Sequence, residues 1–117
     1  MRGLGVVLSQ LGIHAYYEGR WDESIAFYRE SRQVKERAGH VVGAVIQVNN
    51  EGEILSDRGR LDEAVPLFDE MVRVSRSSGW AFGEGIGLSN LGRAAARASR
   101  FEHAHDPHAD RGIARRR

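Results

Sequence analysis

The residues with the greatest capacity for chemistry stand near the carboxyl terminus, in the stretch EHAHDPHAD at positions 102–110. Imidazole nitrogens and carboxylate oxygens are ligands that zinc accepts in proteins. Their spacing here matches no established zinc site, and no rigid frame surrounds them. We therefore predict no metal site and interpret the stretch as degenerate terminal sequence, although it contains the candidate ligands His103, His105, Asp106, His108 and Asp110.

Two glycine-rich stretches have the composition of phosphate-binding loops, GLGVVL at 3–8 and GEGIGL at 83–88. A dinucleotide-binding loop needs the complete G-x-G-x-x-G spacing after a strand, and a P-loop needs a lysine after its last glycine. Neither stretch completes that pattern or follows a predicted strand. The only lysine, Lys35, lies elsewhere in RQVKERAG. We predict no nucleotide site and no cofactor.

No combination of nucleophile and base stands out, so we predict that the protein is not an enzyme. The serines fall in repeat and turn positions. The acidic pairs Asp22/Glu23 and Asp62/Glu63 open predicted helices, where they complement the helix dipole. The chain has no cysteine, which excludes disulfides and thiolate metal sites and fits a cytoplasmic location.

The charge pattern argues against nucleic acid and membranes as partners. The formal net charge is +1, which creates no global field for phosphate groups. The terminal RGIARRR at 111–117 has arginines but no aromatic residue on which bases could stack, so we interpret it as a solubilising tail. No apolar run approaches the roughly 18 residues that span a bilayer.

The elements that position these side chains repeat every forty residues, and such a fixed period indicates a repeat architecture. Gly12, Gly52 and Gly92 each begin one copy of the pattern. Seven residues later the chain has glycine, glycine and serine, and an arginine follows each time. The same register relates the small residues Ser24, Ala64 and Ala104 and the aromatic residues Tyr28 and Phe68, and it is broken by His108.

Each unit is predicted to form two helices joined by a short turn at its second glycine. Apolar and small residues recur at helical spacing, and no stretch alternates as a strand would. Gly39 and Gly79 suit the left-handed position that ends a helix. A glycine within a helix costs about 1 kcal/mol against alanine, so we expect close packing around the others. The expected contacts are Gly12 with Ser24, Gly52 with Ala64 and Gly92 with Ala104, with large aromatic residues filling the layer between hairpins.

The stretch LGIHAYYEGRWDESIAFY at 11–28 resembles the tetratricopeptide repeat in a longer, forty-residue form. The resemblance extends over roughly residues 4–105. It implies an all-α fold of antiparallel helix-turn-helix repeats, stacked as a right-handed α-solenoid of about two and a half repeats. Glu51 departs from the pattern, because an apolar residue is usual there. Stretches such as NNEGEILSDRGRLDEAVPLF are also similar to repeat arrays at the C-terminal end of actinobacterial adenylate cyclases and ATPase-type regulators.

We expect one repeat domain at residues 1–105, with units near 1–39, 40–79 and 80–105, and a loose basic tail at 106–117. In the third unit we expect a turn at Ser99 and then a short second helix, because Pro107 within a helix costs about 3 kcal/mol or more. So short a stack lacks capping helices and exposes apolar ends. We therefore expect a fragment, a truncated gene product, or a piece that pairs with itself or with a larger parent.

In the family that the sequence resembles, the first helix of each unit lines a concave groove. Amides in such a groove could bind the backbone of an extended peptide, and charges could select its side chains. The alternative is that Asn50 and Asn90 bridge neighbouring helices, which we favour for those two, and that the remainder is solvated surface. Without a groove lysine we do not expect the family's clamp for a terminal carboxylate. Counted from the three glycines, the implied groove residues are Ser9, Gln10, Ile13, Tyr16, Tyr17, Asn49, Asn50, Glu53, Asp57, Ser89, Asn90, Arg93 and Arg97.

The resemblance therefore implies a non-catalytic module that binds a protein or an extended peptide, within or between bacterial signalling proteins. The alternative is a regulatory piece of a multidomain enzyme, such as a nucleotide cyclase or a regulatory ATPase. Self-association through the uncapped ends of the stack is a further expectation.

Overall fold

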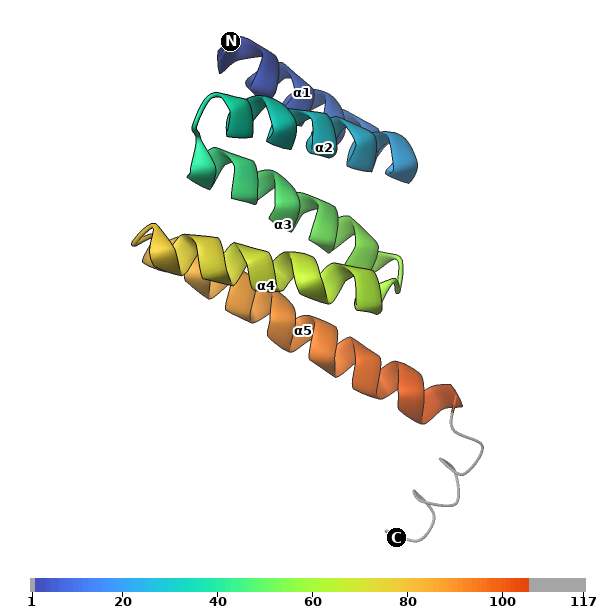
Figure 1. Ribbon diagram of the computed structural model, residues 1–117. Helices are drawn as coiled ribbons and strands as arrows, with labels where there is room; N and C mark the ends of the chain where they lie inside the picture. The colour runs from blue at the N-terminus through green and yellow to red at the C-terminus, as the bar shows by residue number, and fades with distance from the viewer. Residues whose placement is uncertain (1, 106–117) are drawn as a thin grey trace, which may run out of the picture.

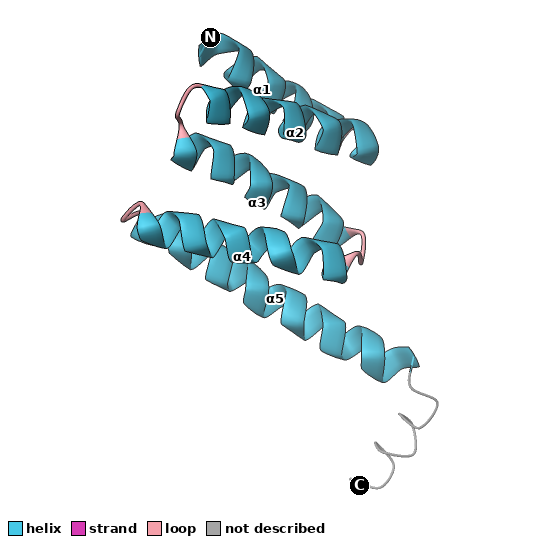
Figure 2. Ribbon diagram, viewed as in Figure 1, coloured by secondary structure: helices cyan, strands magenta, loops and turns pink. Residues whose placement is uncertain are grey.

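The structure, a computed structural model, describes residues 2–105 and folds them into five α-helices (Figure 1). No strand occurs within that range, and short turns join the helices (Figure 2). Each helix packs against the next, and α3 also touches α5, so the chain forms an all-α helical repeat array. The expected basic tail, Pro107 and His108 lie outside the described residues. The helices are α1 (Arg2–Tyr17), α2 (Trp21–Arg37), α3 (Val41–Asp57), α4 (Leu61–Ser77) and α5 (Ala81–His105).

Four glycines make the turns. Gly19, Gly39, Gly59 and Gly79 have φ between 71° and 78°, a left-handed conformation that costs glycine little. At the end of α2, the N–H of Gly39 donates to the carbonyl of Glu36 and the N–H of His40 to that of Lys35. These two bonds form a Schellman motif, which satisfies carbonyls at the helix end. The same pattern recurs at each of the other three turns.

The glycines within α1 and α3 make room for aromatic rings of their own hairpin. A Cβ atom on Gly12 would lie 2.8 Å from Cε1 of Tyr28, and one on Gly52 would lie 2.7 Å from Cε1 of Phe68. The atoms nearest to an added Cβ on Gly52 belong to Phe68 and Leu67, so the expected contact with Ala64 is not the closest one at this glycine. The contact of Gly12 with Ser24 exists as a hydrogen bond of 2.6 Å from Oγ to the glycine carbonyl. Each ring packs against the glycine of its own hairpin and also belongs to a core cluster that spans both hairpins and includes Ile54 and Leu55.

The third unit differs from the sequence prediction. Helix α5 continues without a break from Ala81 to His105, so the expected turn at Ser99 is absent. Serine lacks the freedom of Gly19 and Gly59 to adopt a positive φ, and the surrounding AAARASR consists of residues that tolerate a helix well. Gly92 and Ala104 belong to one helix and stand about 18 Å apart along its axis. The expected contact between them is therefore wrong, and Gly92 has no neighbouring atom within 4 Å of an added Cβ.

Two ion pairs join the first hairpin to the second. Glu51, which departs from the usual apolar residue, is 7% exposed. Both Nε and Nη2 of Arg29 donate to its Oε2, at 3.1 and 2.8 Å. The neighbouring Arg32 donates to Glu70 on α4 at 2.7 Å. Because a buried carboxylate is costly without a partner, the bonds from Arg29 explain how an acid is accommodated at position 51.

Candidate binding groove

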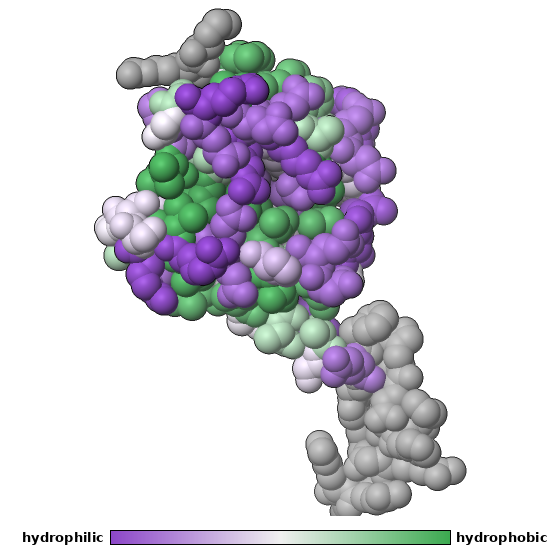
Figure 3. Space-filling model, in the orientation of Figure 1, coloured by the Kyte–Doolittle hydropathy of each residue, from purple (hydrophilic) through white to green (hydrophobic). Residues whose placement is uncertain are grey.

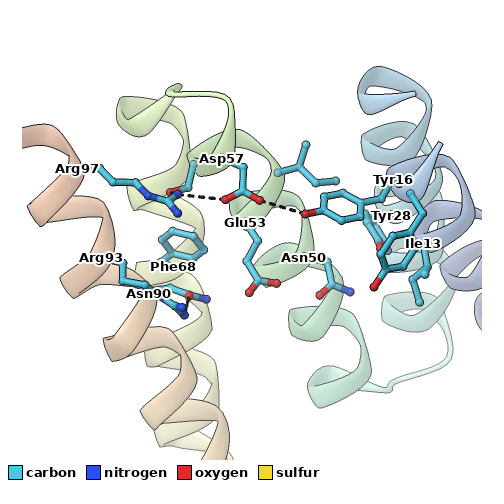
Figure 4. Close-up of a pocket in the computed structure, with 13 residues that line it drawn as sticks. Ile13, Tyr16, Tyr28, Asn50, Glu53, Asp57, Phe68, Asn90, Arg93 and Arg97 are labelled. Atoms are coloured by element: carbon cyan, nitrogen blue, oxygen red, sulfur yellow. Dashed lines mark hydrogen bonds and ion pairs between the residues drawn. The ribbon is translucent and has the colours of Figure 1, made fainter. Parts of the chain in front are cut away.

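A cavity of about 360 Å³ opens along α1, α3 and α5 (Figure 4). We call it the groove. These three helices provide most of its lining, while the rings of Tyr28 on α2 and Phe68 on α4 also reach it. Nine of the predicted groove residues lie here: Ile13, Tyr16, Tyr17, Asn50, Glu53, Asp57, Asn90, Arg93 and Arg97.

Four predicted groove residues do not line the cavity. Gln10 and Ser89 are exposed on their helices. Asn49 is buried beneath the groove, and Ser9 lies between helices, where its hydroxyl contacts Ser31 at 2.8 Å and donates to Gln47 at 3.0 Å. Helical periodicity alone did not separate these positions from their groove-facing neighbours, because each lies next to a lining position or one turn from it.

Four lining residues were missed as groove residues: Tyr28, Ile54, Ser56 and Phe68. The sequence alone indicates Tyr28 and Phe68 only as members of the repeat pattern. The absence of side chains at Gly12 and Gly52 lets these two rings reach through from the second helices toward the groove. The sequence pattern that indicates this arrangement is a glycine followed sixteen residues later by an aromatic residue, which occurs in both hairpins.

Asp57 and Arg97 form a cross-link between α3 and α5. Nη1 of Arg97 donates to Oδ1 of Asp57 at 3.2 Å and to Oγ of Ser56 at 2.7 Å. From the other side, the Tyr16 hydroxyl donates to Oδ2 of Asp57 at 3.3 Å. Burial, and then the charge of Asp57, raise the pKa of Tyr16. Because Asp57 and Arg97 pair with each other, they are less available to a bound peptide than two unpaired charges would be.

The two asparagines at equivalent positions behave differently. Nδ2 of Asn90 donates to Oδ1 of Asn49 at 2.8 Å, and Nη2 of Arg93 donates to Oδ1 of Asn90 at 2.6 Å. Asn90 thus bridges α5 and α3, as the favoured interpretation predicted. Asn50 takes part in none of the side-chain hydrogen bonds found along the groove in the described structure. Its amide remains available on the groove surface (Figure 4).

Glu53 stands between the paired charges and the free amide. It occurs in none of the ion pairs within the described range. Desolvation by the surrounding groove raises its pKa above the ordinary 4.5, and the charge of Arg93 and a contact with the Asn90 amide only partly oppose that rise. The carboxylate therefore lacks a full complement of protein partners.

Aromatic rings form the wall of the groove at α1. The ring centroid of Tyr16 lies 5.3 Å from that of Tyr17 and 5.3 Å from that of Trp21, both in edge-to-face geometry. Tyr17 is 81% exposed and Ile13 is 44% exposed. Rings that are held by neighbours yet open to solvent offer contact area at a small entropic cost.

Two smaller cavities, of about 240 and 270 Å³, lie elsewhere on the described helices. On the face shown in Figure 3, hydrophilic residues cover most of the helices and hydrophobic residues appear between them. Among the described residues no group of three or more His, Cys, Asp or Glu is placed to hold a metal ion. The histidine-rich stretch at 103–108 falls at or beyond the end of the described part, so its interpretation stays a prediction. None of the described helices combines the length and hydrophobicity that crossing a membrane requires.

Comparison with known protein families gives one match. A family model described as "Tetratricopeptide repeat" matches residues 49–78. The matched segment contains most of α3, the Gly59 turn and α4, which together form the second hairpin. No curated protein matches the chain.

Proposed function

Because the chain contains a tetratricopeptide repeat at residues 49–78, we propose that it is a protein-interaction scaffold whose groove binds an extended peptide segment of a partner. The observation that carries this proposal is the cavity of about 360 Å³ along α1, α3 and α5. Its lining combines the free amide of Asn50, the carboxylate of Glu53 and the exposed ring of Tyr17. The lining is mixed, with aromatic rings on the side of α1 and mainly polar or charged side chains on α3 and α5, which suits the polar backbone and side chains of an extended peptide.

The groove is proposed to bind without catalysing a reaction. No imidazole lines it, and its one serine hydroxyl, that of Ser56, accepts a hydrogen bond from Arg97. Its acids are engaged with or attracted to arginines of α5. This arrangement suits recognition of polar groups and provides no activated nucleophile.

A display selection with random dodecapeptides tests the proposal. We expect the immobilised protein to select peptides, and we expect Tyr17→Ala and Asn50→Ala each to weaken the binding of a selected peptide by about tenfold, as loss of a central contact does. Glu30→Ala, on the exposed surface of α2, is the matched control and should leave affinity unchanged. Equal affinities for all three variants, or no selection at all, would reject the groove as the binding site.

We also propose that the module acts in bacterial signalling or regulation, in the cytoplasm. The alternative is that it is the regulatory part of a multidomain enzyme such as a nucleotide cyclase or a regulatory ATPase. One observation favours that alternative, namely the uncovered apolar stripe of α1, where Leu4, Val7 and Leu11 are 42–51% exposed. Such a stripe suits packing against further protein. A cyclase or ATPase domain encoded in the same reading frame would support the alternative, and an isolated short gene would contradict it.

A further inference from the structure

The groove contains four charged side chains whose protein partners differ. Arg97 and Asp57 bond to each other, and the guanidinium of Arg93 donates to Asn90. Glu53 has no ion-pair partner among the described residues. The positive charge of Arg93 lowers the pKa of Glu53, but desolvation of the carboxyl group raises this pKa by more. Arg93 likewise forms no ion pair within the described residues, although its guanidinium bonds to Asn90. Because Asp57 is paired with Arg97, Glu53 is the acid lining the groove that has no ion-pair partner in the described structure.

The tyrosines around the groove lie within the field of that carboxylate. Burial is the largest cause of the raised pKa of Tyr28 and of Tyr16, and the charge of Glu53 contributes to both. The exposed ring of Tyr17 adjoins Tyr16 in edge-to-face contact. Figure 4 shows Glu53 projecting from α3 between Asn90 on one side and, on the other, Asn50 with the rings of Tyr16 and Tyr28 beyond it. A carboxylate and aromatic rings thus border one space.

This combination has a preferred ligand chemistry. A carboxylate forms strong, charge-assisted hydrogen bonds with guanidinium or ammonium groups. Aromatic faces attract the same cations through their quadrupole. The charge of Glu53 would repel an acidic side chain in this space. A purely apolar side chain would cover the carboxylate without giving it a partner, which is costly. Only a cation satisfies both the carboxylate and the rings.

We propose that the space bordered by Glu53, Tyr16, Tyr17 and Tyr28 is a subsite for a basic side chain, an arginine or lysine of the bound peptide. The proposal rests on the proposed function and adds the class of residue that the groove selects. Asn50, one turn before Glu53 on α3, is placed to contact the peptide backbone next to that side chain. Arg93 lies on α5, away from the tyrosine wall, and belongs to a different part of the groove.

A double-mutant cycle on a selected peptide tests the subsite. Dodecapeptides selected by the wild-type protein should share an arginine or lysine at one position. Replacing that residue with norleucine, which keeps the length of the side chain but removes its charge, should weaken binding by about tenfold or more. In Glu53→Gln the same replacement should change the affinity by about twofold or less, because the charge that the cation meets is gone. Glu30→Gln, which removes an exposed acid from α2, should keep the wild-type difference.

Each outcome decides between the two proposals. Selected peptides without a shared basic residue, whose affinity still falls in Tyr17→Ala, would overturn the subsite and leave the groove standing. A basic residue whose replacement has the same effect in wild type and Glu53→Gln would also overturn the subsite. A failure to select any peptide would overturn both proposals. Because Tyr17 and Glu53 are both exposed, both variants should fold, and an unchanged far-ultraviolet circular dichroism spectrum checks this.

Discussion

Two hairpins and one single helix share the same repeat pattern but not the same structure. In the hairpins, Gly12 lies against Tyr28 and Gly52 against Phe68, each so closely that a Cβ atom would overlap the ring. In α5, the equivalent Gly92 has nothing within 4 Å. The hairpins turn at Gly19 and Gly59 with a positive φ, whereas α5 passes straight through Ser99.

The difference shows that the repeat glycine is useful only together with a second helix. Where the ring of the second helix is present, glycine allows the two backbones to approach and lets that ring reach the groove. In α5, where no second helix of the described part packs against Gly92, the glycine retains its entropic cost of about 1 kcal/mol and gains no packing. We therefore expect substitution of the glycine to destabilise the protein at position 52 and to stabilise it at position 92.

Leucine substitutions at these two positions should produce the largest contrast. Gly52→Leu places a side chain against Cε1 of Phe68 at 2.7 Å and Cβ of Leu67 at 3.3 Å. We expect this overpacking to lower the free energy of unfolding by about 3 kcal/mol. Gly92→Leu meets open space and should raise the free energy of unfolding by up to about 1 kcal/mol through helix propensity. Urea denaturation followed by circular dichroism measures both, and equal effects would show that the hairpin packing is wrong.

Turn substitutions should give the next largest effect. Gly59 has φ 78°, so Gly59→Ala should lower the free energy of unfolding by about 1–2 kcal/mol, the cost of a left-handed conformation for a residue with a Cβ. Ser99→Gly lies within a continuous helix and should be destabilising by about 0.5 kcal/mol. Thermal unfolding compares the two variants. If Ser99→Gly were instead stabilising, α5 would turn at this position as the other units do.

The equivalent asparagines provide a smaller contrast. Asn90→Ala removes the 2.8 Å bond to Asn49 and should lower the free energy of unfolding by about 1 kcal/mol. Asn50→Ala removes no side-chain bond found along the groove and should change the free energy of unfolding by less than about 0.5 kcal/mol. Urea denaturation at neutral pH measures both. A larger decrease in the free energy of unfolding for Asn50→Ala than for Asn90→Ala would contradict the conclusion that the Asn50 amide makes no structural hydrogen bond.

The smallest expected effect concerns Glu53 and pH. The pKa of Glu53 is raised in the folded state, chiefly by desolvation, so the ionised carboxylate opposes folding. This destabilisation is present above the folded pKa and disappears as the pH falls below the unfolded value. Glu53→Gln should therefore have a slightly higher melting temperature than the wild type at pH 7, and the difference should vanish by about pH 4. A variant that is less stable than the wild type at pH 7 would show that Glu53 is structurally required.

Much of the fold was predictable because glycine marks its turns and the forty-residue period marks its units. The positions of Gly19, Gly39, Gly59 and Gly79 indicated where helices end, and each adopts a positive φ. The continuation of α5 was not predicted because the third unit retains most of the repeat pattern. The one difference at the turn position, Ser99 in place of glycine, is enough to keep the helix continuous, because serine adopts a positive φ only at an energetic cost.

The sequence allowed most residues that line the groove to be predicted, but not the hydrogen bonds and ion pairs between them. Helical spacing from the three glycines identified nine lining residues. It did not reveal that Asp57 and Arg97 pair across helices, because that bond depends on how closely α3 and α5 approach. Nor did it reveal that Tyr28 and Phe68 reach the groove from the second helices, because a periodic pattern assigns a residue to a helix face but not to a side-chain direction.

The most direct test of the account is a map of amide chemical shifts for the ¹⁵N-labelled protein on addition of a selected peptide. We expect shifts at residues of α1, α3 and α5 that line the groove, with Tyr17, Asn50 and Glu53 among those most affected. Residues on the exposed surface of α2 and α4, such as Glu30 and Arg73, should remain unchanged. Shifts concentrated on α2 and α4, or along Leu4, Val7 and Leu11, would contradict the groove as the site of binding.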